Sequence, residues 1–281
     1  LPDGDSTFGY QSAREAGTDV VEHLTADARS TGRWYLVVAM GRKAGHLALG
    51  IGISSGATLS IIPEQFGFQT IALPQITEII VGAILKRLTQ QRSYGVVVLA
   101  EGLAELLDPA TVPELAQAER DPHGNIRFAE VDFGRIVREA VKQKLADLGV
   151  KLTIVDKNVG YELRCVPPNP FDREYTRLLG FGIVDFLLNG GTEAMISRQK
   201  NTLVPIPFSE LIDPVTGKTK IRTVDLDSLI YRVGKKYMIE LTADDLKERL
   251  SALAVELEDV SFELSKRMSV FEVDEGELEA S

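Results

Sequence analysis

The chain contains 281 residues, of which 44% are hydrophobic and 26% are charged, and its formal net charge is −10. This composition is typical of a globular protein that buries a sizeable core. The acidic balance argues against a broad nucleic-acid-binding surface, which would need clustered Lys and Arg. No apolar run is long enough for a membrane-spanning helix, so we expect neither nucleic acid nor membrane as a partner.

The single cysteine, Cys165, excludes an internal disulfide framework and favours a reducing, cytoplasmic environment. The three histidines are scattered and show no spacing typical of a zinc site, so we expect no metal-binding residues. The chain opens in a turn-like segment and has no initiator Met. We therefore expect it to begin inside a longer polypeptide.

The N-terminal half alternates between residues at helical spacing and short apolar runs. Helices are predicted over Thr7–Ala28, Ala44–Ser55 and Gln75–Arg92, and strands over Tyr35–Ala39, Ala57–Ile62 and Tyr94–Leu99. The helix at Gln75–Arg92 has the clearest pattern, with isoleucines and other apolar residues on one face. This order of elements is typical of parallel strands joined by helices.

The C-terminal half is predicted to contain helices at Gly134–Leu148, Arg173–Asn189 and Asp244–Leu257, and strands at Lys151–Val155 and Gln199–Pro207. Residues Asp213–Lys218 form a predicted turn, which leaves open a hairpin with Ile221–Val224 on its far side. The acidic tail at Glu272–Ser281 is expected to fray. The alternation of strands and helices predicts an α/β fold with a doubly wound sheet.

A charged turn, Met40-Gly41-Arg42-Lys43, follows the first predicted strand. It therefore lies at the carboxyl end of a strand, where open α/β sheets bind ligands. Gly41 allows close approach of the backbone to an anion, and Arg42 beside a helix N-terminus fits a phosphate. Turns of this type also occur as plain connectors, so the turn alone leaves both interpretations open.

Further polar residues lie near predicted strand ends or in Gly- and Pro-rich loops: Arg33, Glu101, Tyr161 and Arg164. Arginines bind phosphate through two parallel hydrogen bonds, while Glu and Tyr bond sugar hydroxyls, so the set suits a sugar phosphate. Each residue also has a simpler interpretation. Arg33 could be solvated, Glu101 could cap the following helix, and Tyr161 could pack against its neighbours.

Other residues that could carry chemistry are better explained by structure. His46 within a predicted helix is more often a packing residue than a base. The pair Asp172-Arg173 is typical of a helix N-terminal cap, and Asp225 and Asp227 are typical of a solvated loop.

Five segments in sequence order carry a resemblance to a known family. They are GDSTFGYQSA (Gly4–Ala13), MGRKAGHLAL (Met40–Leu49), IIPE (Ile61–Glu64), VLAEG (Val98–Gly102) and GYELRCVPPNPFDR (Gly160–Arg173). The whole chain resembles phosphofructokinases, and in particular their pyrophosphate-dependent branch. The resemblance implies a Rossmann-like phosphofructokinase fold. It also implies that residues 1–281 form a partial, substrate-binding portion of that domain, with a C-terminal extension over about 205–281.

The resemblance assigns roles to individual residues. It implies that fructose 6-phosphate is bound by Met40, Gly41, Arg42, Glu101, Tyr161 and Arg164, and that Arg42 also offsets charge in the transition state. Arg33 stands seven residues before Met40, where relatives place an arginine that reaches the sugar phosphate of a neighbouring subunit. The resemblance therefore implies a homo-oligomer, a dimer or a tetramer.

The implied reaction moves a phosphoryl group from pyrophosphate to the 1-hydroxyl of fructose 6-phosphate, which gives fructose 1,6-bisphosphate in glycolysis. Mg²⁺ would accompany the pyrophosphate, held mostly by residues outside this chain. The family's Gly-rich donor loop and its T-I-D-N-D motif, which supplies the general base, are expected before Leu1. Asp3 and Asp5 match the segment after that motif and do not inherit the role of the base.

Three alternatives remain open. The donor could be ATP, although Tyr161 in G-Y-E-x-R is similar to the pyrophosphate-dependent pattern, where ATP-dependent relatives usually carry His. The chain could also belong to a non-catalytic regulatory subunit that binds the sugar phosphate without turnover. A fragment that binds nothing is the third alternative, because an incomplete sheet exposes an edge and apolar faces.

Overall fold

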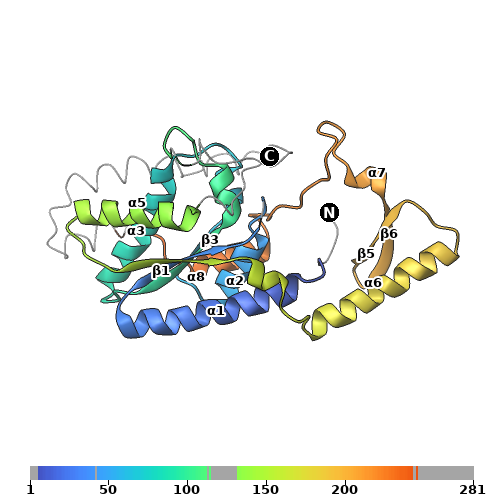
Figure 1. Cartoon of the computed structure of the whole chain (residues 1–281), viewed down its shortest axis with the longest axis horizontal. Helices are drawn as coiled ribbons and strands as arrows, with labels where there is room; N and C mark the ends of the chain where they lie inside the picture. Colours follow the sequence, from blue (N-terminus) through green and yellow to red (C-terminus); the bar gives the residue numbers. More distant parts are fainter. Residues whose placement is uncertain (1–5, 42, 113, 115–131, 243–244, 246–281) are drawn as a thin grey trace, which may run out of the picture.

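A four-stranded parallel sheet forms the centre of the molecule (Figure 1). The computed structural model describes residues 6–41, 43–112, 114, 132–242 and 245. The strand order is β2-β3-β1-β4, with bounds β1 (Trp34–Ala39), β2 (Leu59–Ile61), β3 (Gly95–Ala100) and β4 (Ile154–Val159). All three strand pairs are parallel, which confirms the α/β class expected from the sequence.

Helices cover both faces of this sheet. On one face α1 (Tyr10–Thr31) packs against α2 (His46–Ser55), and on the other α3 (Leu73–Thr89) packs against α5 (Phe133–Asp147) (Figure 1). Every residue of β1 and β3 is buried, as expected for central strands of a parallel sheet covered on both sides. The hydrophobic core therefore lies in the two layers between the sheet and these helices.

The small residues of α2 allow it to pack closely between α1 and the sheet. A Cβ atom on Gly50 would lie 2.4 Å from Oη of Tyr10, and one on Gly52 would lie 1.8 Å from Oγ of Ser60. Real side chains do not approach so closely, so larger residues would push α2 off its neighbours. The close packing of α2 fixes the position of the turn that precedes it.

Each of the strands β2, β3 and β4 is followed directly by a short 3₁₀ helix. These are η1 (Pro63–Phe66), η2 (Glu101–Glu105) and η3 (Tyr161–Arg164). In a parallel sheet all these segments lie at the same edge, the carboxyl edge of the strands.

A second unit, here called the arm, consists of α6 (Pro170–Leu188), β5 (Ala194–Gln199), β6 (Thr202–Pro207) and α7 (Phe208–Leu211). It extends away from the sheet (Figure 1). Its two strands pair antiparallel around Lys200-Asn201, and both of these residues have positive φ angles, of 47° and 65°. Positive φ at both central residues is the geometry of a type I′ hairpin turn.

After the arm, the chain comes back to the sheet in what we call the return segment, residues 222–242, which contains α8 (Leu229–Tyr237). Ile53 of α2 packs so closely under Gly234 that an added Cβ would lie 2.4 Å from it. The Ile239 amide donates to the carbonyl of Thr58, just before β2, at 2.8 Å. The return segment therefore packs along α2 and reaches the β2 end of the sheet.

The predicted elements agree with the structure in the N-terminal half and differ at several points after it. The strand predicted at Lys151–Val155 is placed too early in the sequence, because β4 begins at Ile154 and continues through polar residues to Val159. Because β4 is an outer strand of the sheet, its polar side chains can pair with neighbouring residues, as Asp156 does with Arg138 of α5. Helix α6 begins at Pro170, before the predicted Arg173, because Asn169 caps it by accepting from the Asp172 amide at 3.0 Å.

Four further predictions concern the C-terminal part of the chain. The strand predicted at Gln199–Pro207 is confirmed as β6, but the sequence analysis missed its hairpin partner, β5. Ile221–Val224 is not a hairpin strand, because pairing beyond the Asp213 turn is limited to one bridge, Ile212 to Thr219. The helix predicted at Asp244–Leu257 and the tail Glu272–Ser281 lie outside the described residues, apart from position 245.

Candidate functional site

The carboxyl edge of the sheet brings together three segments that are far apart in the sequence. Ala39, the last residue of β1, pairs with Ala100 of β3 on one side and with Val159 of β4 on the other. The next residues along these strands are Met40, Glu101 and Gly160. Because neighbouring strands lie about 4.8 Å apart, the three segments are adjacent at this edge.

A hydrogen bond joins the turn after β1 to the residue after β3. The Gly41 amide donates to Oε2 of Glu101 at 3.1 Å, and the Met40 amide donates to the Val159 carbonyl at 3.0 Å. Gly41 has a φ of +151°, and an added Cβ would lie 3.1 Å from the carbonyl oxygen of Ala44. Glycine is therefore needed for the turn to adopt this conformation.

The same turn carries positive charge next to acidic residues of η2. Nζ of Lys43 lies 4.0 Å from Oε2 of Glu105. Arg42 lies outside the described residues, so its predicted role at the substrate and in the transition state stays a prediction.

Tyr161 and Arg164 come from η3, at the end of β4. Tyr161 is 68% exposed, so its side chain is not part of the hydrophobic core. The Arg164 guanidinium lies over the tyrosine ring, 5.3 Å from its centre, in a cation–π contact. The two side chains thus offer a cation and a phenolic hydroxyl on the surface beside the Met40–Gly41 turn.

Arg33 lies at the other end of β1, directly before Trp34. The strand has six residues, so at about 3.3 Å per residue Arg33 is separated from Met40 by about 20 Å. Its Nε lies 3.7 Å from a carboxylate oxygen of Asp27. Within one chain Arg33 is therefore not part of this site, and its contribution to a neighbouring subunit stays a prediction.

Glu64 is a residue of this region that the sequence analysis did not include among the candidates. It follows β2 in η1, and its side chain is buried, with 5% exposure. Its carboxylate accepts hydrogen bonds from the amides of Gly45, at the start of α2, and of Val224, in the return segment. A charged residue directly after a buried strand and a proline was the signal that could have identified it.

His46, the first residue of α2, is held by contacts on several sides. The Tyr10 hydroxyl donates to its backbone carbonyl at 3.0 Å. Burial, together with the positive charge of Arg222, lowers the pKa of His46 below its ordinary value of 6.5. A neutral, half-buried imidazole fits the interpretation of His46 as a packing residue.

Comparison with known protein families shows to which family the chain belongs. The family model described as Phosphofructokinase matches residues 1–187. The chain belongs to the phosphofructokinase family. The match includes β1 to β4, the turn at Met40–Gly41, and η1 to η3, so the carboxyl edge described above lies within the family domain.

Two curated relatives of this phosphofructokinase-family chain are named pyrophosphate--fructose 6-phosphate 1-phosphotransferase. The protein of Naegleria fowleri is 48% identical over 90% of this chain, and that of Thermotoga maritima is 44% identical over 88%. The chain spans only 61% and 60% of the lengths of these relatives. A solved pyrophosphate-dependent phosphofructokinase from Nitrosospira multiformis, 16% identical, supports the fold, with a TM-score of 0.54 over 85% of this chain and 57% of that one.

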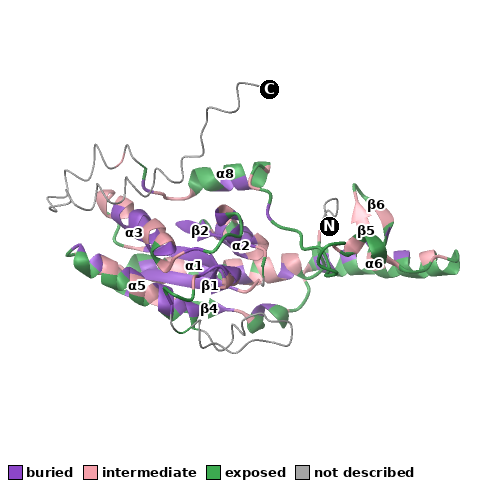
Figure 2. Cartoon of the chain, turned by 90° about the horizontal axis from the view of Figure 1, so that it is seen from above, coloured by how far each residue is buried: buried purple, intermediate pink, exposed green. Residues whose placement is uncertain are grey.

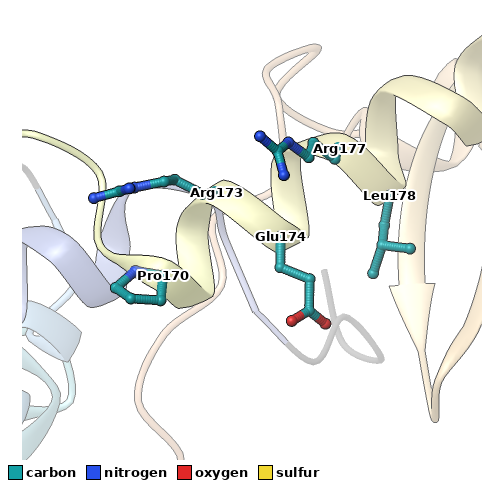
Figure 3. Close-up of a pocket in the computed structure, with 5 residues that line it drawn as sticks. All are labelled: Pro170, Arg173, Glu174, Arg177 and Leu178. Carbon is teal, nitrogen blue, oxygen red and sulfur yellow. The ribbon is translucent and has the colours of Figure 1, made fainter.

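A surface hollow in the arm offers a different cluster of charges. It has a volume of about 460 Å³ and is lined by residues of one helix: Pro170, Arg173, Glu174, Arg177 and Leu178. Figure 3 shows that the Glu174 carboxylate points away from the two guanidinium groups. Nε of Arg173 donates to the Pro168 carbonyl at 2.7 Å. These side chains do not converge on one point, so the carboxyl edge remains the better candidate site.

Two properties of the phosphofructokinase-family chain concern metals and membranes. Among the described residues, no group of three or more His, Cys, Asp or Glu side chains is placed to hold a metal ion. Within the same ranges, no helix has both the length and the apolar character needed to cross a lipid bilayer.

Proposed function

We propose that the protein containing this chain transfers a phosphoryl group from pyrophosphate to fructose 6-phosphate. The phosphorus–oxygen bond to the leaving phosphate breaks and a bond to the 1-hydroxyl oxygen forms, while the hydroxyl proton passes to a general base outside this chain. The products are fructose 1,6-bisphosphate and phosphate. The observation that carries the proposal is the hydrogen bond from the Gly41 amide to Glu101. It joins two of the family's acceptor-binding segments at one edge of the sheet, next to Tyr161 and Arg164.

Each side chain at this edge suits one part of the sugar phosphate. Arg164, exposed and charged, would bind the 6-phosphate, since guanidinium groups match phosphate oxygens in geometry and charge. The Glu101 carboxylate would accept hydrogen bonds from sugar hydroxyls, with Met40 and Gly41 beside it and Tyr161 adding its hydroxyl. Arg42 would offset charge on the transferring group, because phosphoryl transfer depends mainly on positioning and charge stabilisation.

The donor site would come from parts of the protein outside this chain. The two relatives with 48% and 44% identity are named for pyrophosphate as donor, which supports pyrophosphate over ATP. We propose Mg²⁺ as the cofactor that accompanies pyrophosphate. It would be held mostly by residues outside this chain.

The proposed protein is a cytoplasmic homo-oligomer of glycolysis. A site that needs Arg33 from a second copy would explain why this arginine lies at the end of β1 opposite to Met40. The single, exposed Cys165 is compatible with a reducing compartment.

An assay of the longer protein tests the proposal, with pyrophosphate or ATP as donor and fructose 1,6-bisphosphate as the measured product. We expect turnover with pyrophosphate, and we expect Arg164→Ala to raise KM for fructose 6-phosphate far more than it lowers kcat. Arg177→Ala, in the arm, is the matched control and should leave KM unchanged. Turnover with ATP alone would favour the ATP-dependent alternative, and binding without turnover would favour a regulatory subunit.

A further inference from the structure

We propose that Glu64 is a positioning residue that holds the turn at residues 41–45 in its substrate-binding conformation and connects this turn to the return segment. The inference rests on the proposed function, since it concerns the same acceptor site. Glu64 itself would not touch the substrate, because its side chain is only 5% exposed and lies behind the turn, under the start of α2.

The first support is the set of hydrogen bonds that the buried carboxylate makes. The Gly45 amide donates to both of its oxygens, at 2.9 Å to Oε1 and 3.2 Å to Oε2. The Val224 amide donates to Oε1 at 2.9 Å. A buried carboxylate is costly unless it is well bonded, and breaking such contacts leaves buried donors without partners. Glu64 therefore keeps these two backbone segments in fixed positions.

The second support is the close fit between Glu64 and Gly45. A Cβ on Gly45 would lie 2.7 Å from Oε2 of Glu64 and 2.4 Å from Cβ of Ile62, so only glycine allows this approach. Gly45 also caps the N-terminus of α2, where the helix dipole favours a negative charge. The Glu64 carboxylate therefore fits closely against Gly45 and the N-terminus of α2.

The third support is that the turn is held at both ends. The Gly41 amide is bonded to Glu101, and the Gly45 amide is bonded to Glu64. Glu101 follows β3 and Glu64 follows β2, so two neighbouring strands hold one short turn. The two bonded amides are four residues apart, so both ends of the turn are fixed.

The return segment provides a matched control. Nε2 of Gln65, the residue after Glu64, donates to the Tyr231 hydroxyl at 3.1 Å. This second contact between η1 and the return segment does not involve the turn at 41–45. Tyr231→Phe therefore disturbs the same two segments without removing a hydrogen bond from the turn.

The experiment compares Glu64→Ala, Glu64→Gln and Tyr231→Phe in this chain. Calorimetry measures the Kd for fructose 6-phosphate, and hydrogen exchange measures protection of the Gly41 and Gly45 amides. We expect Glu64→Ala to raise Kd about tenfold or more and to lower protection of both amides. Glu64→Gln keeps one acceptor oxygen, so its Kd should stay within about threefold, as should that of Tyr231→Phe.

Two results would overturn the inference. One is an equal loss of affinity in Glu64→Ala and Tyr231→Phe, because the effect would then be general destabilisation. The other is unchanged protection of the Gly41 and Gly45 amides in Glu64→Ala. If the unmutated chain binds no fructose 6-phosphate, the acceptor site needs parts of the longer protein, whose assay tests the proposed function, and the exchange data alone then decide the role of Glu64.

Discussion

The sheet with its covering helices buries its apolar side chains, whereas the arm leaves one face of α6 uncovered (Figure 2). In β1 the Leu36 side chain has no exposed surface, while on α6 Phe181 is 68% exposed, Val184 56% and Leu188 82%. These three residues lie at helical spacing on one side of α6. Exposed apolar stripes of this kind are typical of surfaces that contact other protein.

The difference shows which part of the chain can be stable by itself. The sheet region has a closed core, but the arm consists of a helix on a two-stranded hairpin, an arrangement that is only marginally stable alone. Its connection to α1 depends on Asp172, which is 1% exposed and accepts from the amides of Gly9 and Ser12 at 2.7 and 2.8 Å. Asp172 thus caps α1, not its own helix as the sequence indicated. We expect the arm to open more easily than the sheet.

The largest effect is expected from a substitution in the centre of the sheet. Leu36→Ala removes a fully buried side chain and should lower the free energy of unfolding by about 3 kcal/mol. Urea unfolding followed by circular dichroism measures this change. A loss below about 1 kcal/mol would mean that the sheet core is not closed as described.

A smaller effect is expected at the junction between the two regions. Asp172→Ala leaves the Gly9 and Ser12 amides without their acceptor and should lower the protection of α6 amides by about 2 kcal/mol. Hydrogen exchange resolved by segment measures it, with Asp172→Asn, which retains one acceptor oxygen, as the milder variant. Equal loss of protection in β1 and α6 would contradict the separation of the two regions.

The pH dependence of stability offers a third test, within the sheet region. Because the pKa of His46 is lowered in the folded protein, an unfolded chain takes up a proton there at about pH 6.5, while the folded chain does not. Stability should therefore fall as the pH is lowered through that value, and His46→Gln should reduce the slope. His23→Gln, on the exposed side of α1, is the control. An unchanged slope in His46→Gln would remove His46 as the cause.

The smallest effect is expected on the uncovered face of the arm. Leu188→Ala makes the same chemical change as Leu36→Ala but at an exposed position, so the free energy of unfolding should change by less than about 0.5 kcal/mol. The same urea titration compares the two variants directly. A loss similar to that of Leu36→Ala would show that this face is covered in solution.

The sequence predicted the fold best where burial alone produces the hydrophobic pattern. The apolar runs around Leu36 and Val97 are strands buried on both faces, and a continuous apolar run is enough to predict such a strand. The edge strand β4 was misplaced because Asp156 and Lys157 interrupt its apolar pattern. The hairpin turn at Lys200-Asn201 depends on positive φ angles, which only Asn201 indicates in the sequence.

In the candidate site, too, some residues could be predicted from the sequence and others could not. Met40, Gly41 and Glu101 were predicted from their place at strand ends, and parallel pairing brings these ends together. The role of Glu64 could not be predicted in the same way, because its donors, Gly45 and Val224, depend on packing of the return segment against α2. Long-range contacts of this kind leave no periodic pattern in a single sequence.

Calorimetric titration of fructose 6-phosphate into this chain tests the central claim most directly, that the carboxyl edge of the sheet is the acceptor site. The unmutated chain is compared with Arg164→Ala, at that edge, and with Arg177→Ala, in the hollow of the arm. The account predicts saturable binding that Arg164→Ala abolishes and Arg177→Ala retains. Binding that survives Arg164→Ala, or that Arg177→Ala removes, would contradict it.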